Sequence, residues 1–303
     1  MNWLIKAGIQ GVLSISPSRS DLNYFFQRYI TRSLVLNKAK LKLRLEWCNT
    51  HIEYYQKYRN MLPETVFELG TGWLLTVPLG LHLCGVKEIY TIDIHDLTKT
   101  QILKDMIQIM TSYTFEELQM ILPHIKQELF EAFVAQKDQS PQEILKNCNI
   151  HFRVMDARHT DFADQQFDFF ISNTTLEHIP YGVIDGIFKE FYRIAKQTAL
   201  MSHLIDMSDH YSHFDINLSP YHFLQHNKTV WQLVNNQLMY QNRLRIPDFR
   251  RLHSDSYFQI LYEKNQLKHA ASLQSTHLAQ EFKHYSPEDI IPTSSWMISE
   301  RLP

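Results

Sequence analysis

The stretch VFELGTGWLLTVPLGLHLCGVKEIYTIDIH, residues 66–95, carries the pattern that decides the fold. A short apolar run ends in Gly70-Thr71-Gly72, an apolar helical segment follows, and EIYTIDI at 88–94 is a second apolar run. Short apolar runs bounded by glycine are typical of buried parallel strands, and parallel neighbours need a crossover that is usually a helix. The stretch therefore predicts a strand, a glycine turn, a helix and a second strand.

The same alternation continues along the chain and predicts a doubly wound α/β fold with a mostly parallel sheet. We expect strands at 65–69, 88–94, 150–157, 167–173 and 198–205, a helix, turn and strand within 247–264, and a late edge strand at 294–302. We expect helices within 21–36 and at 38–60, 73–84, 97–146 and 182–196. Residues 206–246 show little regular pattern.

Composition narrows the class of protein. The chain has 303 residues, with 30 basic and 32 acidic side chains and a formal net charge of -2, so no basic footprint for nucleic acid is present. Its three cysteines are far apart and odd in number, which indicates free thiols in a reducing compartment. The N-terminal segment makes a poor signal peptide, and no apolar run reaches the roughly 20 residues of a spanning helix. We expect a cytoplasmic protein without a transmembrane segment.

Two ligand classes fit a glycine turn with an acid at the end of the next strand. Ligands of doubly wound sheets bind beyond the carboxyl ends of the strands, where Asp93 can accept hydrogen bonds from ribose hydroxyls. A dinucleotide and S-adenosylmethionine share this requirement. The dinucleotide fingerprint G-x-G-x-x-G needs a third glycine at position 75, which is Leu75. The turn is therefore a poorer match to a pyrophosphate.

The segments VFELGTG, YTIDI, MDA and FDFFISNTTLEHIP resemble the successive motifs of class I S-adenosylmethionine-dependent methyltransferases. The resemblance covers residues 63–205 and continues plausibly through 247–303. It implies a Rossmann-like sheet of seven strands, with FQILYEK and SSWMISERL as the antiparallel sixth and seventh strands. Many members have a further glycine where this chain has Leu74. We expect a helical cap at 1–62 and a methyltransferase domain at 63–303, with insertions at 97–149 and 206–246.

The resemblance implies a role for each matching residue. Gly70 and Gly72 line the methionine part of the cofactor, Asp93 binds the ribose diol, Asp156 accepts from the adenine amine, and Asn173 lies beside the methyl donor. The full expected set is Glu68, Gly70, Thr71, Gly72, Asp93, Ile94, Asp156, Ala157 and Asn173. Taken singly, each of these residues could equally form a turn, a strand end or a cap.

Methyl transfer to an oxygen often needs a base, and histidine is suited to that task near neutral pH. Candidates follow the fourth and fifth predicted strands: His178, His203, Asp206 and His210. Any one of these histidines could instead be structural. His210 and His213, with Asp209 and Asp215 nearby, also suit a divalent ion, but tight ligand spacing is lacking and we expect no metal.

The expected reaction is in-line transfer of methyl from S-adenosylmethionine to a hydroxyl or amine of a small molecule, such as a glycan precursor or secondary metabolite. We expect no nucleic acid partner, and a homodimer is one assembly the chain could form. The alternatives are a methyltransferase acting on RNA or protein, a non-catalytic scaffold with the same fold, and a nicotinamide-dependent oxidoreductase. Two short basic runs favour the alternative of an RNA substrate: KAKLKLR at 38–44 and RLRIPDFRR at 243–251.

Overall fold

A computed structural model of the chain describes residues 34–236, 240–267 and 270–303, together with Trp3, Gly8, Gly11, Tyr24 and Arg28. The helix predicted within 21–36, and with it most of the first part of the predicted cap, lies outside these residues. Within the described part of the chain, no helix combines the length and the apolar composition needed to cross a bilayer.

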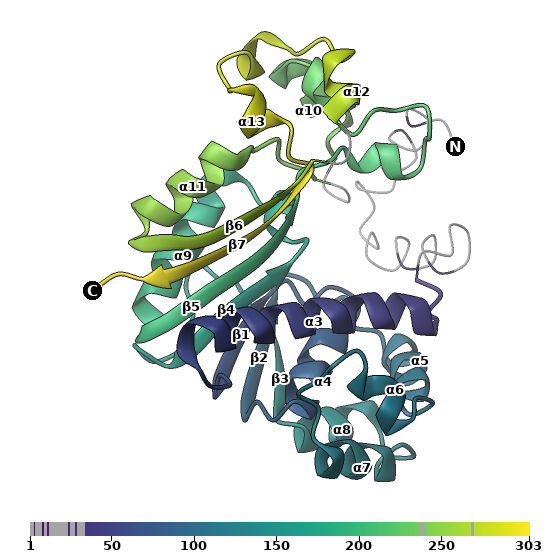
Figure 1. Cartoon of the computed structure of the whole chain (residues 1–303). Coiled ribbons are helices and arrows are strands. Elements are labelled where there is room, and N and C mark those ends of the chain that lie inside the picture. Colours follow the sequence, from purple (N-terminus) through teal and green to yellow (C-terminus); the bar gives the residue numbers. More distant parts are fainter. Residues whose placement is uncertain are drawn as a thin grey trace. The chain divides into compact units, whose positions relative to one another are not determined.

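A seven-stranded sheet of order β3-β2-β1-β4-β5-β7-β6 organises the fold (Figure 1). β1 pairs in parallel with β2 and β4, β2 pairs in parallel with β3, and β7 is antiparallel. This confirms the predicted α/β class and the seven-stranded topology. The strands are β1 Thr65–Leu69, β2 Glu88–Asp93, β3 Ile150–Val154, β4 Phe167–Asn173, β5 Ala195–Asp206, β6 Phe258–Gln266 and β7 Ser294–Arg301.

The prediction of an edge strand at 294–302 is wrong. β7 lies between β5 and β6, so β6 forms the edge of the sheet. Met297 and Ile298 are both fully buried, although successive residues of a strand point to opposite faces. Cover on both faces is what an inner strand requires, and the composition of the segment does not distinguish an inner strand from an edge strand.

The helices confirm most of the sequence pattern. Those of the first half are α3 Lys38–Arg59, α4 Thr76–Leu83, α5 Thr100–Met110, α6 Phe115–Gln119, α7 Gln127–Ala135 and α8 Pro141–Asn147. Those of the second half are α9 Tyr181–Ile194, α10 Lys228–Val234, α11 Ile246–Asp255, α12 Ala270–Gln274 and α13 Pro287–Ile290. Short 3₁₀ turns are η2 Leu176–His178, η3 His210–His213, η4 His222–Gln225 and η5 Gln280–Phe282. The helices α10, α12 and α13 were not predicted.

The described residues form two compact units. The N-terminal unit contains residues 34–173, 189–202 and 298–303, and the C-terminal unit contains residues 174–188 and 203–297. The predicted division into a cap at 1–62 and a domain from residue 63 stays a prediction. The helix α3, which belongs to that predicted cap, packs on α4 inside the N-terminal unit.

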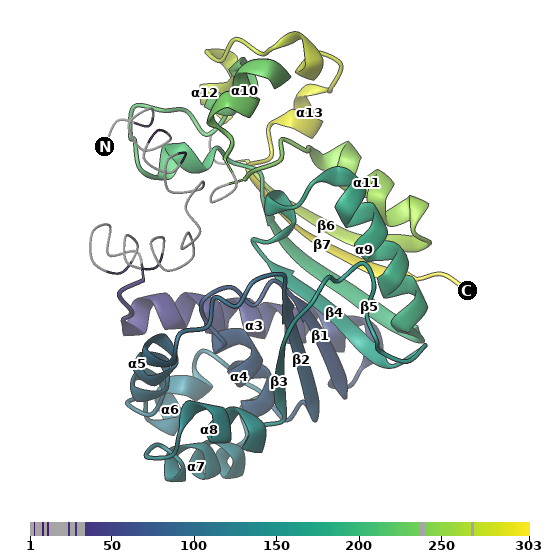
Figure 2. The same cartoon turned by 180° about the vertical axis from the view of Figure 1, so that it is seen from behind.

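The N-terminal unit has an aromatic core beneath β1 and β4. Phe67 meets Phe167 edge to face at 5.3 Å, and Phe170 lies 4.6 Å from Phe191. Each such pair contributes about 0.5–1.5 kcal/mol beyond the area that it buries. Helices α4 and α8 pack against β2 and β3, as Figure 2 shows. This packing holds the carboxyl ends of β1, β2 and β4 in place.

The C-terminal unit builds its own core from the predicted insertion at 206–246. Tyr211, Phe223 and Trp231 are buried together with Phe282 and Ile290, far along the chain. The insertion contains only the short elements η3, η4 and α10, which explains its irregular sequence pattern. Its aromatic side chains pack into the core of the C-terminal unit. It is therefore an integral part of this unit.

Candidate functional site

The glycine turn after β1 has the backbone that only glycine adopts without strain. Gly70 and Gly72 have φ values of 83° and 60°, in the left-handed region. The Gly72 N–H donates to Oδ2 of Asp93 at 2.9 Å, and the Gly70 N–H donates to the Ile92 carbonyl at 2.8 Å. A Cβ added at Gly72 would meet nothing within 4 Å. The turn is therefore tied to β2 and leaves open space at Gly72.

Glu68 supports this turn from within the unit. Its carboxylate accepts from the Thr91 hydroxyl at 2.6 Å, and the Thr91 and Thr71 hydroxyls are also 2.6 Å apart. Glu68 is only 4% exposed, and this burial raises its pKa to about 8, although the Thr91 hydrogen bond and the Arg44 cation oppose the rise. At neutral pH the side chain is therefore largely protonated in the protein without ligand.

Asp93 ends β2 and has both carboxylate oxygens engaged by backbone. Oδ1 accepts from the His95 N–H at 3.0 Å, while Oδ2 holds Gly72. Each oxygen keeps a second lone pair, which is what a ribose diol would use. The next residue, Ile94, is 60% exposed and presents an apolar surface.

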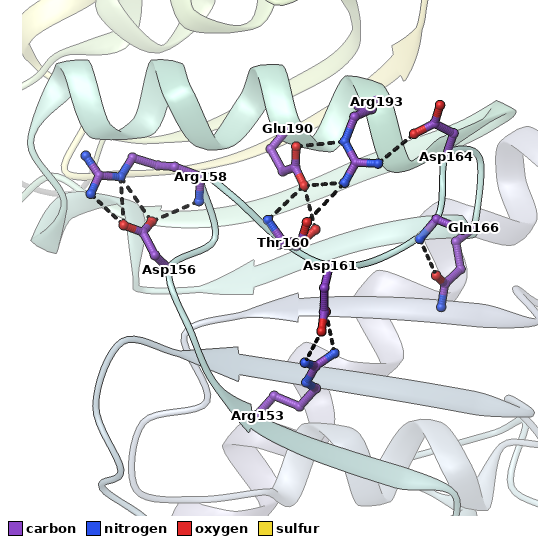
Figure 3. A network of polar contacts seen from close by, with 10 residues as sticks. Arg153, Asp156, Arg158, Thr160, Asp161, Asp164, Gln166, Glu190 and Arg193 are labelled. Carbon is purple, nitrogen blue, oxygen red and sulfur yellow. Dashed lines mark hydrogen bonds and ion pairs between the residues drawn. The ribbon is translucent and has the colours of Figure 1, made fainter.

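Asp156 follows β3 and faces Arg158 (Figure 3). The Arg158 Nε lies 3.0 Å from both carboxylate oxygens, and its Nη2 lies 2.5 Å from Oδ2. These bonds lower the pKa of Asp156. Ala157 is buried between the two. An adenine amine would therefore share the Asp156 carboxylate with Arg158, a partner that the motif itself did not reveal.

Asn173, at the end of β4, is held by a histidine that the sequence analysis missed. His51 on α3 has Nε2 3.0 Å from the Asn173 Oδ1 and Nδ1 2.7 Å from the Ser202 Oγ. Burial lowers the pKa of His51 to about 3, so the ring is neutral. A neutral ring fits these contacts if Nε2 donates to Asn173 and Nδ1 accepts from Ser202. The sequence pattern that could have identified His51 is a polar residue on the otherwise apolar face of α3.

The C-terminal unit brings together three of the four predicted catalytic residues. His178 and His210 lie edge to face with ring centroids 4.9 Å apart, and the His210 Nε2 lies 3.6 Å from the Asp206 Oδ2. Burial opposes ionisation of Asp206, but hydrogen bonds from His210 and Ser208 outweigh it and lower its pKa. Glu177 completes the group, since its ligand atom and those of His178 and His210 lie within 4.8 Å of one another.

His203, the fourth predicted catalytic residue, lies in the core of the C-terminal unit. It is fully buried, and its ring stacks on Phe188 at 5.4 Å with 14° between the planes. His253 contacts the same pair of rings. A histidine enclosed in this way has no route to an acceptor, so His203 is not a candidate base.

Comparison with known proteins supplies the family. A family model described as a methyltransferase domain matches residues 119–202. No curated protein matches the chain in sequence. The match begins after the glycine turn and spans β3, β4, α9 and most of β5. The match does not include Gly70, Gly72 and Asp93, so the roles expected of them stay predictions.

Solved structures of similar fold include methyltransferases from several organisms. An S-adenosylmethionine-dependent methyltransferase of Methanosarcina mazei is 14% identical, with a TM-score of 0.48 over 82% of this chain and 97% of that one. Geranyl diphosphate C-methyltransferase of Streptomyces coelicolor is 10% identical, with a TM-score of 0.46 over 84% of this chain and 77% of that one. Similarity at this level says nothing about the substrate.

The family match and the strand order agree with the site geometry. The match places the fourth and fifth strands within a methyltransferase domain, and the sheet has the mixed order typical of that fold. A glycine turn with open space and a carboxylate at the end of the next strand provide the features that a sulfonium nucleoside requires. The chain therefore carries a class I S-adenosylmethionine-dependent methyltransferase domain, with S-adenosylmethionine as its methyl donor.

Proposed function

We propose that the protein transfers the methyl group to a hydroxyl of a small molecule, such as a glycan precursor or a secondary metabolite. The sulfonium carbon is already activated by its positive charge, so the protein has to align the acceptor, exclude water and remove a proton. The C–S bond breaks as the C–O bond forms, sulfur leaves as a neutral thioether, and the hydroxyl proton passes to a base of the protein.

The observation that carries this proposal is the His210–Asp206 pair. Asp206 ends β5, and ligands of such sheets bind beyond the carboxyl ends of the strands. The lowered pKa of Asp206 keeps its carboxylate charged beside His210, so it can orient the imidazole and stabilise the imidazolium that forms. His178, next to His210, is a second polar contact for an acceptor.

The basic run at 243–251 supports a small acceptor over RNA, because three of its four arginines are engaged by other groups of the protein. Arg245 is fully buried, Arg243 pairs with Glu281, and Arg250 pairs with Glu263 and Asp289. Guanidinium groups engaged in this way are not free to contact phosphates, which is the main source of affinity for RNA.

Two lysines of the basic run at 38–44 also form ion pairs with glutamates. Lys38 lies 3.2 Å from Glu117 and Lys42 lies 3.9 Å from Glu46. These exposed ion pairs are weak, about 0–1 kcal/mol each, but they offset the positive charge of the helix face. The net charge of -2 agrees with a surface that does not attract a polyanion.

Two measurements test the proposal. Calorimetry should show micromolar binding of S-adenosylhomocysteine and no tight binding of NAD. Transfer of a labelled methyl group should then be screened over hydroxyl-bearing sugars and secondary metabolites, with amine-bearing analogues and RNA as competing acceptors. Labelling of RNA but of no small molecule would overturn the proposed acceptor class.

The base is tested separately once an acceptor is found. Asp206→Asn should lower turnover by about 10²–10⁴-fold, because His210 loses the carboxylate that orients it and stabilises its imidazolium, and should leave the affinity for S-adenosylhomocysteine unchanged. His226→Gln, which alters another partly buried imidazole of the C-terminal unit, is the matched control and should retain turnover. Equal loss in both variants, or loss of cofactor affinity in Asp206→Asn, would indicate a structural effect.

A further inference from the structure

We propose that Glu177, His178 and His210 form a binding site for a divalent transition-metal ion. Their ligand atoms lie within 4.8 Å of one another, and all three residues belong to the C-terminal unit. A metal centre with nitrogen and carboxylate ligands typically has each ligand about 2.1 Å from the ion. The three side chains therefore have to close by roughly 1 Å to hold one.

The burial of the Glu177 carboxylate favours a bound cation. It is only 1% exposed, and among the described residues its carboxylate has no side-chain partner, only the backbone groups of residues 177 and 206. A buried carboxylate without a cationic partner costs several kcal/mol, whereas a bound cation compensates its charge directly.

His178 has the orientation of a metal ligand. Its Nδ1 lies 2.7 Å from the Tyr240 carbonyl oxygen and must donate to it, because a carbonyl only accepts. The lone pair is therefore on Nε2, the atom left to bind an ion. Histidine ligands usually donate their other N–H to a carbonyl or carboxylate in this way. Part of His178 is exposed, which gives an ion a path from solvent.

His210 supplies the second imidazole of the proposed site, and the carboxylate of Asp206 lies beside it. Its Nε2 lies 3.6 Å from the Asp206 Oδ2, while the Asp206 Oδ1 accepts from the Ser208 N–H and hydroxyl. Two acidic side chains, Glu177 and Asp206, thus border the same pair of imidazoles. A divalent cation would balance both charges.

One short segment fixes the two ligand-bearing turns. The Tyr240 carbonyl holds His178, the Gln241 Oε1 accepts from the His210 N–H at 3.2 Å, and the Asn242 N–H donates to the Glu177 carbonyl at 2.7 Å. Asn242 also donates through Nδ2 to the carbonyls of residues 176 and 179. Residues 240–242 therefore support each proposed ligand from outside, as a second layer of contacts does around a metal.

The donor set selects the kind of ion. Two imidazole nitrogens and one carboxylate suit zinc, manganese, cobalt or iron, whereas magnesium and calcium prefer oxygen ligands. Three protein ligands leave positions for water or for an oxygen of another molecule. His210 cannot accept a proton through the nitrogen that binds the ion, so it is a ligand when the ion is bound and the base of the proposed function when the ion is absent.

Direct binding tests the site without any assay of methyl transfer. The full chain, freed of metal by chelation, is dialysed against Zn²⁺ and separately against Mn²⁺, and bound metal is counted by elemental analysis. We expect one ion per chain for at least one metal. Glu177→Gln, which keeps the shape but removes the charge, should weaken binding by at least tenfold, and His178→Ala should do the same.

His226→Gln is the matched control and should bind as the unaltered chain does. Far-ultraviolet circular dichroism of each variant checks that it is folded, and Glu177→Gln is the variant least prone to unfold because it replaces a strained buried acid with a neutral amide. Absence of stoichiometric binding for both ions would overturn the proposal. Unchanged affinity in folded Glu177→Gln, or loss in His226→Gln alone, would also overturn it.

Discussion

Replacement of Glu68 by glutamine should change how the stability of the protein depends on pH. Glu68 has an ordinary pKa of 4.5 when unfolded and a pKa of about 8 in the folded chain, chiefly because it is buried. A carboxyl group with a raised folded pKa contributes its full stability below pH 4.5, and that contribution is lost as the pH rises toward 8. Glutamine mimics the protonated acid and can still accept from Thr91, but it does not titrate.

The expected size of the effect follows from the two pKa values. The whole change is about 5 kcal/mol, and about 3 kcal/mol of it falls between pH 5.5 and 8.5. Since folded proteins are stable by only about 5–15 kcal/mol, this should be visible as a displaced unfolding midpoint. Glu68 is almost completely buried, so no large correction for solvent screening applies.

Urea unfolding of both chains at several pH values, without ligand, measures the effect. The unfolding free energy of the unaltered chain, relative to Glu68→Gln, should fall by about 3 kcal/mol across pH 5.5–8.5. Thr91→Val removes the hydroxyl that favours the charged carboxylate, so the fall should extend to higher pH while still beginning near pH 4.5. Parallel curves for the unaltered chain and Glu68→Gln would refute the reasoning, because they would mean that water reaches the carboxylate.

Three further substitutions test other parts of the structure. Asp93→Ala should weaken S-adenosylhomocysteine binding by at least tenfold in calorimetry, because it removes the expected ribose acceptor and releases the Gly72 N–H. Gly72→Ala should lower the unfolding free energy by about 1–2 kcal/mol, since the φ of 60° strains any side chain although space is available. Arg245→Met should cost about 3–5 kcal/mol in urea unfolding, because the buried guanidinium holds the carbonyls of residues 207, 290 and 292 and these would lose their donor. No change in the midpoint of either unfolding curve would contradict the corresponding account.

Local sequence patterns were enough to predict the positions of the strands, of most helices and of the glycine turn. Apolar runs and helical periodicity report burial within one segment, and β4 at 167–173 agrees with its prediction at both ends. Glycine at positions 70 and 72 marks a backbone that other residues adopt only with strain. The acid at 93 was informative because parallel strands end at one edge of the sheet, so order along the chain becomes proximity in space.

The sequence by itself determined the fold class and predicted the cofactor half of the site, because both depend on patterns of residues close together in the chain. Only the tertiary structure decided that His51 holds Asn173, that Arg158 occupies Asp156 and that His203 is enclosed in the core. It also decided that Glu177 and His178 meet His210 from a distant turn, since residues 240–242 hold both turns. Such contacts depend on how separate segments pack, and periodicity along one segment contains no information about its partner.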